Sequence, residues 1–131
     1  MDKLHEKLFP VLLTGKVVHG KALGRTVGMP TANIEICDES LLPACGVYAT
    51  RIKVSGKQYM AVTNIGLRPT VDNEPQVTVE AHILDFDQDI YGQSVELEVH
   101  KLLRSIQKFN SLEEVLNQVK EDIAEAKKCL Q

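Results

Sequence analysis

Apolar and polar side chains alternate along most of this chain with a period of two residues, which is the period of a β-strand. Segments of this kind, rich in β-branched residues, are separated by glycine, proline or polar turns. They lie at residues 11–18, 32–36, 46–54, 57–64, 76–84 and 94–102. No helical pattern is interleaved between them, so the pattern predicts six antiparallel strands in a barrel or a sandwich.

After Phe109 the apolar residues recur at steps of three and four, the period of an α-helix. They are Leu112, Val115, Leu116, Val119, Ile123, Ala126 and Leu130. Ser111 and Glu114 have the spacing of a capping box at the start of such a helix. We therefore expect one long amphipathic helix over about 111–130, packed by its apolar stripe on the strands.

Two strand segments carry further information. Ser55-Gly56 separates 46–54 from 57–64 and favours a hairpin between them. In segment 76–84 one face is apolar, whereas the opposite face carries Glu80 and His82. A carboxylate such as Glu80 could accept a proton from a substrate hydroxyl, but one acid among the chain's 18 could equally be a solvated surface group. His82 is expected to be a hydrogen-bond partner beside it.

Composition narrows the class of protein. The chain has 131 residues, 44% hydrophobic and 25% charged, which is typical of one globular domain. Its net charge of −3 argues against a dedicated nucleic-acid binder. No apolar run has the length of a signal peptide or a membrane span. The three cysteines lack metal-site spacing, which favours free thiols in a reducing compartment. We expect a cytoplasmic protein that binds no membrane.

The chemistry is concentrated between Gly15 and Glu35, which read GKVVHGKALGRTVGMPTANIE. Three glycines fall four residues apart, and two cations each follow one of them: Gly20, Lys21, Gly24, Arg25 and Gly28. Such a loop can bend sharply and bring backbone N–H groups and cations to an anion. It is not a Walker A loop. From these residues alone, a solvent-exposed hairpin is the alternative interpretation.

A hydroxyl and an amide follow directly, at Thr31 and Asn33. In an extended segment, residues two apart project from the same face, so both oxygens can point at one object. Mg²⁺ accepts such neutral oxygen ligands and shares its shell with phosphates and water. An ordinary turn, in which both side chains hydrogen-bond the local backbone, is the other interpretation.

The string GKALGRTVGMPTAN closely resembles the signature of the riboflavin kinase (flavokinase) family, which forms the kinase half of bacterial bifunctional FAD synthetases. The resemblance extends from about Gly15 to Leu130. We expect a single domain over 1–131: a mainly β, six-stranded antiparallel Greek-key-type barrel at about 10–103 and the C-terminal helix packed on it. The implied reaction transfers the ATP γ-phosphoryl group to the 5′-hydroxyl of riboflavin, with Mg²⁺, to give FMN and ADP.

The resemblance also implies roles for individual residues. The segment VEAHILDF aligns with the family's Glu-x-His-Ile stretch, which makes Glu80 the catalytic base. Thr31 and Asn33 are the expected metal ligands. The nucleotide-binding residues it implies are Gly20, Lys21, Gly24, Arg25, Pro30, Thr31 and Asn33. Asn64-Ile65-Gly66 matches a family segment beside which adenine or flavin edges would bind.

Flavin contacts are expected from three more positions. Leu103-Arg104 and Lys108-Phe109 resemble the family's Leu-Arg…Lys-Phe segment, in which the arginine and the aromatic line the flavin and its phosphate. Tyr91 lies in DFDQDIYG, which resembles the family's Asp-Leu-Tyr-Gly connection. Phe109 could also act as a hydrophobic staple for the helix. Ser105-Ile106-Gln107 stands where the family usually has an acidic residue or proline.

Other functions remain to be compared with the kinase. A non-catalytic flavin or nucleotide sensor on the same barrel would bind both ligands without forming product. A nucleic-acid- or protein-binding barrel is disfavoured by the acidic balance and by the lack of an aromatic platform. The family's upstream nucleotidyltransferase sequence does not precede the first strand, so the chain is expected to be either a stand-alone kinase or a piece of a longer bifunctional enzyme, and the start of the sequence favours the former. We expect a monomer and no FAD synthesis by this chain.

Overall fold

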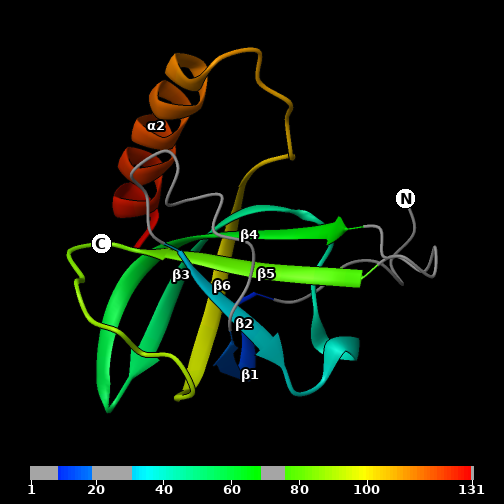
Figure 1. Cartoon of the computed structure of the whole chain (residues 1–131), viewed down its shortest axis with the longest axis vertical. Helices are drawn as coiled ribbons and strands as arrows, with labels where there is room; N and C mark the ends of the chain where they lie inside the picture. Colours follow the sequence, from blue (N-terminus) through cyan, green and yellow to red (C-terminus); the bar gives the residue numbers. More distant parts are fainter. Residues whose placement is uncertain (1–8, 19–30, 69–75, 131) are drawn as a thin grey trace.

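The computed structural model describes residues 9–18, 31–68 and 76–130. Within this part of the chain, six antiparallel strands close into a barrel in the order β1-β2-β5-β4-β3-β6 (Figure 1). The elements are β1 (Val11–Val18), β2 (Ala32–Ile36), the short 3₁₀ helix η2 (Glu39–Leu41), β3 (Gly46–Val54), β4 (Lys57–Arg68), β5 (Gln76–Ile83), β6 (Ser94–Arg104) and α2 (Leu112–Leu130). The predicted mainly β barrel with one C-terminal helix is confirmed, and a barrel rather than a sandwich is formed.

Strands β3, β4 and β5 are consecutive neighbours, and β6 returns to pair with β3 on its other side. This arrangement is the Greek key. The turn between β3 and β4 has positive φ at Ser55 (52°) and Gly56 (81°), as a type I′ turn requires, and it pairs Val54 with Lys57. The hairpin expected from Ser55-Gly56 is therefore present.

Strand β4 is longer than the sequence pattern predicts. It continues to Arg68 instead of ending at Asn64, because Ile65 extends the interior face of the strand and is 1% exposed. Gly66 is accommodated within the strand: an added Cβ there would lie 3.3 Å from the side chain of Ile106. The glycine thus leaves room for the segment that follows β6 to pass over β4.

The barrel interior is filled by branched aliphatic side chains, among them Leu13, Ile34, Ile52, Ile65, Val79, Leu97 and Val99. Two hydroxyls are buried with them, and they satisfy each other: Thr50 Oγ1 lies 2.8 Å from Thr63 Oγ1 and 3.1 Å from the carbonyl oxygen of Ala61. At one end of the barrel the Tyr48 hydroxyl donates to the Ala44 carbonyl. Burial, with a smaller contribution from Cys45, raises the pKa of Tyr48, so the phenol remains a donor.

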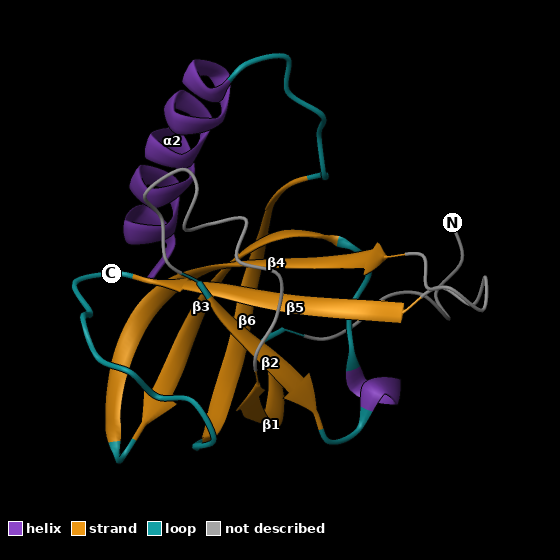
Figure 2. Ribbon diagram, viewed as in Figure 1, coloured by secondary structure: helices purple, strands orange, loops and turns teal. Residues whose placement is uncertain are grey.

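A second apolar cluster lies outside the barrel, where α2 packs on β3, β4 and β6 (Figure 2). Its centre is Ala49 on β3 with Ala126 and Leu130 on α2, all nearly inaccessible to solvent. The first part of β3, residues 46–50, is consequently buried on both faces. Arg51 donates from its guanidinium to the carbonyl oxygen of Leu130 and ties the last helical turn to the barrel.

The start of α2 is capped as predicted. The Glu114 backbone N–H donates to Ser111 Oγ at 3.2 Å, and the Glu114 carboxylate accepts from the Asn110 N–H at 3.3 Å. The first residue of the predicted apolar stripe, Leu112, is 51% exposed, so only the later turns of the helix are buried. No helix in the described ranges is long and apolar enough to cross a membrane.

Candidate active site

A row of directly opposed residues crosses the outer face of the barrel wall. Asn33 on β2 pairs with Glu80 on β5, and Glu80 pairs with Asn64 on β4. The row continues through Val47 on β3 to Arg104 on β6. Directly opposed residues of antiparallel strands project on the same side with their Cβ atoms about 5 Å apart. The row therefore brings two amides, a carboxylate and a guanidinium onto one surface.

This surface is the outer one because the residues that alternate with the row point into the core. On β5, Val79 and Ala81 are buried on either side of Glu80. On β4, Thr63 and Ile65 are buried on either side of Asn64. The strand period predicted from the sequence thus separates the packing residues from the polar ones.

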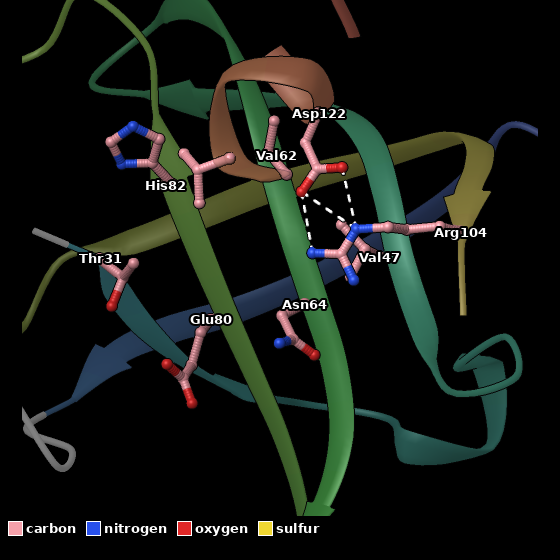
Figure 3. A pocket seen from close by; sticks show the side chains of 9 residues that line it. Thr31, Val47, Val62, Asn64, Glu80, His82, Arg104 and Asp122 are labelled. Atoms are coloured by element: carbon pink, nitrogen blue, oxygen red, sulfur yellow. Dashed lines mark hydrogen bonds and ion pairs between the residues drawn. The ribbon is translucent and has the colours of Figure 1, made fainter. Parts of the chain in front are cut away.

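Most of the row lines a pocket between the strands and α2 (Figure 3). The pocket is lined by Thr31, Val47, Val62, Asn64, Glu80, His82, Arg104, Val119 and Asp122. Three valines give it an apolar part, which suits a flat ring system, and the remaining residues supply hydrogen-bonding groups. Concave, partly apolar sites with a few convergent polar groups are the usual form of small-molecule sites.

The two expected metal ligands, Thr31 and Asn33, and the expected base, Glu80, come together at one side of this surface. Thr31 and Glu80 line the same pocket, and Asn33 is the cross-strand partner of Glu80. A hydroxyl, an amide oxygen and a carboxylate are the hard oxygen donors that Mg²⁺ prefers. In the described residues there is no cluster of three or more His, Cys, Asp or Glu side chains that could hold a metal ion by themselves. A cation here would need to share its shell with other ligands.

At the opposite side of the pocket, Arg104 forms a bidentate ion pair with Asp122 of α2. Arg104 Nη2 lies 2.9 Å from Asp122 Oδ2, and Nε lies 2.9 Å from Oδ1. Gln118 also donates to Asp122 Oδ1 at 3.1 Å. The Asp122 side chain is 5% exposed and that of Arg104 is 19% exposed. The Arg104 guanidinium carbon lies 5.7 Å from the centre of the Phe109 ring, so the two residues stack beside the pocket.

The other predicted site residues either lie outside the described residues or do not line this pocket. Gly20, Lys21, Gly24, Arg25 and Pro30 lie outside the described residues. Tyr91 lies in the connection between β5 and β6, is 54% exposed and does not line the pocket. Phe109 reaches the site through Arg104 and is not itself a lining residue. The flavin-binding roles of Tyr91 and Phe109 stay predictions.

Two polar residues of the pocket, Asn64 and Asp122, are not among the site residues predicted from the sequence. The sequence indicates Asn64 only as part of a family segment, and its position opposite Glu80 follows from strand pairing. Asp122 received no role, although it had a signal: it lies three residues after Val119 and four before Ala126, within the apolar stripe of the helix. A carboxylate on the buried stripe of a helix requires a partner, and here that partner is Arg104.

The cysteines take no part in the described pocket. Cys37 and Cys45 are exposed and Cys129 is half-buried, and all three are free thiols, as expected from their spacing. None of them lines the cavity.

A family model and a curated relative agree on the family of this chain. A family model described as "Flavokinase: Riboflavin kinase" matches residues 7–130. The bifunctional riboflavin kinase/FMN adenylyltransferase of Bacillus subtilis (strain 168) is 40% identical over 119 residues, which cover 89% of this chain and 38% of that protein. The chain therefore spans little more than a third of the length of this curated relative.

Two solved structures share the fold. The riboflavin kinase from Trypanosoma brucei matches with a TM-score of 0.68 and 31% identity, over 96% of this chain and 83% of that one. A crystal structure described as a macrolide-efflux protein from Streptococcus pneumoniae matches with a TM-score of 0.84 and 36% identity, over 90% of this chain and 38% of that one.

Proposed function

Because this chain belongs to the riboflavin kinase family, we propose that it transfers the γ-phosphoryl group of ATP to the 5′-hydroxyl of riboflavin, giving FMN and ADP. The observation that carries the proposal is the outer-face row, in which Glu80 stands between Asn33 and Asn64 at the edge of a partly apolar pocket. The B. subtilis relative is named also for FMN adenylyltransferase activity, but the chain covers 38% of it. We propose the kinase reaction alone.

Glu80 is the proposed general base. Phosphoryl transfer depends mainly on positioning and on neutralising charge, and the enzyme also has to orient the attacking hydroxyl. A carboxylate on the pocket wall can accept the hydrogen bond of the riboflavin 5′-hydroxyl and take its proton as the new P–O bond forms. The two flanking amides can hold the hydroxyl or the phosphate oxygens, since each offers both a donor and an acceptor.

Thr31 and Asn33 are the proposed protein ligands of Mg²⁺, and their neutral oxygens fit that ion. The ion, when bound, neutralises charge on the β- and γ-phosphates of ATP. From the family resemblance we also propose that Gly20, Lys21, Gly24 and Arg25 contact the phosphates. Loop glycines allow the backbone to approach them closely.

The apolar part of the pocket is the proposed site of the isoalloxazine ring. Val47 and Val62 from the barrel and Val119 from α2 supply apolar contacts on two sides. The stacked Arg104 and Phe109 offer flat surfaces at one edge of the site. In this arrangement the ring lies toward α2 and the ribityl chain reaches toward Glu80.

The test is direct. The purified chain is incubated with riboflavin and Mg-ATP, and FMN is separated from riboflavin by chromatography and quantified by fluorescence. We expect each protein molecule to form many molecules of FMN and to release one ADP for each FMN formed. A sensor would bind riboflavin or ATP without forming FMN, and that result would reject the kinase assignment.

We further propose that the protein acts as a cytoplasmic monomer whose partners are these two small molecules and not nucleic acid. The net charge of −3 supports the last point. Light scattering coupled to size exclusion should give the mass of one chain.

A further inference from the structure

Most of the hydrogen-bonding edge of Arg104 is already engaged within the protein. A guanidinium has five N–H donors. Nε and Nη2 donate to the Asp122 carboxylate, and Nη1 donates to the Ser105 carbonyl oxygen at 3.2 Å. The fork formed by Nε and Nη2 is therefore occupied by a carboxylate and cannot bind a phosphate bidentately. Arg104 keeps its flat face and its remaining N–H groups for a ligand.

The orientation of Asp122 is fixed from a second side. Gln118, one helical turn earlier, donates to the same oxygen that accepts from Arg104 Nε. The carboxylate is almost fully buried, so water does not compete for it. The ion pair is consequently a fixed feature of the pocket wall.

The charge of the described pocket wall follows from this pair. Its acidic side chains are Glu80 and Asp122 and its guanidinium is Arg104, so the carboxylates of the described wall outnumber the guanidinium by one. Riboflavin is uncharged. Its 5′-phosphate carries a charge of about −1.5 to −2 at pH 7. The described wall thus favours the substrate over the product.

We propose that Asp122 determines the selectivity of this pocket between the two flavins of the reaction. It cancels the charge of Arg104, so that uncharged riboflavin binds in preference to anionic FMN. The inference rests on the proposed kinase function and adds a role that the reaction scheme does not contain. Weak product binding would assist release, which limits turnover in many enzymes.

Asp122→Asn tests the proposal, because asparagine keeps an oxygen acceptor for Arg104 but removes the charge. Dissociation constants for riboflavin and FMN are measured by flavin fluorescence at low ionic strength. The affinity for FMN relative to riboflavin should rise by about 3- to 15-fold, the size expected for one unit charge acting on a phosphate dianion about 10 Å away. The gain should shrink in 0.5 M NaCl, since salt screens exposed charges at this range.

Glu121→Gln is the matched control. It removes the same charge from an exposed position next to Asp122 on α2 and should leave the affinity ratio unchanged. Arg104→Gln should move the ratio in the opposite direction, because the Asp122 charge is then unbalanced. This variant keeps the proposal testable if Asp122→Asn does not fold.

If Asp122 has a purely structural role, Asp122→Asn should weaken the binding of riboflavin and of FMN equally. The ratio of the two affinities would then stay at the wild-type value. That outcome, in a wild-type protein that forms FMN, would overturn this inference alone. A wild-type protein that forms no FMN would overturn the proposed function and the selectivity inference together.

Discussion

The inner and outer faces of the barrel wall are built on the same strands from different kinds of side chain. On the inner face, aliphatic residues fill the space, and the buried hydroxyls of Thr50 and Thr63 bond each other. On the outer face, Asn33, Glu80 and Asn64 stand in a row. The alternation of a strand therefore lets one segment stabilise the fold and carry chemistry without either requirement restricting the other.

The comparison has a practical meaning: substitutions on the two faces should change different measurements. Inner-face changes should lower the free energy of unfolding and leave the turnover of folded molecules near normal. Changes in the outer-face row of Asn33, Glu80 and Asn64 should lower turnover or ligand affinity and leave the unfolding transition in place.

The largest effect is expected at Glu80. Glu80→Gln should lower kcat by about 10²- to 10⁴-fold, the usual contribution of a general base, with an unchanged thermal unfolding transition. Glu35→Gln is its control, because Glu35 is an exposed carboxylate on the outer face of β2. Normal turnover by the Glu80→Gln variant would show that Glu80 is not the general base.

Next in size is a cavity on the inner face. Ile52 is fully buried, and Ile52→Ala should lower the free energy of unfolding by about 2–5 kcal/mol in urea denaturation. The neighbouring Lys53 is exposed, and Lys53→Ala should change stability by less than about 0.5 kcal/mol. Should Ile52→Ala instead reduce kcat per folded molecule as much as Glu80→Gln does, the separation of the two faces would be wrong.

A smaller outer-face effect is expected at Asn33. Asn33→Ala should raise the KM for Mg-ATP by about tenfold, which corresponds to the loss of one polar contact worth about 1.4 kcal/mol. The KM for riboflavin should change little. Steady-state kinetics with each substrate varied in turn measures both. An equal rise in both KM values would indicate that Asn33 supports the structure of the site in general and does not contact the nucleotide specifically.

The smallest effect is expected far from either face, at the helix start. Ser111→Ala removes the oxygen that accepts from the Glu114 N–H and should lower stability by about 1 kcal/mol. Ser111→Asp keeps a capping oxygen and should retain the stability. Riboflavin phosphorylation should proceed normally in both variants, as judged by the FMN assay.

Much of the barrel could be predicted from local pattern. The first three strands begin and end where the alternation does, because their boundaries are marked by turn residues such as Ser55-Gly56. Prediction failed where tertiary contacts override local signals. Gly66 suggests a strand end, yet β4 continues through it because the preceding Ile65 is buried in the barrel and the strand stays paired with β5 as far as Arg68.

The site could be predicted less completely, for a physical reason. The family resemblance indicates Glu80, and the spacing from Thr31 indicates Asn33, but their opposition depends on the β2–β5 register, which no local pattern contains. The Arg104–Asp122 pair joins residues 18 positions apart, on a strand and a helix, and was missed because pairing of charges is a property of the folded chain.

The barrel includes one short strand pairing, between β2 and β5, which is called the seam below. In the described residues β2 and β5 are joined by two opposed pairs, Ala32 with Ala81 and Asn33 with Glu80, whereas β3 and β4 are joined by nine. Local opening should therefore begin at that seam, and its amide hydrogens should exchange with deuterium sooner than those of the β3–β4 hairpin. A nucleotide and a flavin bound across Asn33 and Glu80 would hold β2 and β5 together. Bound substrate should therefore slow this exchange and stabilise the closed barrel.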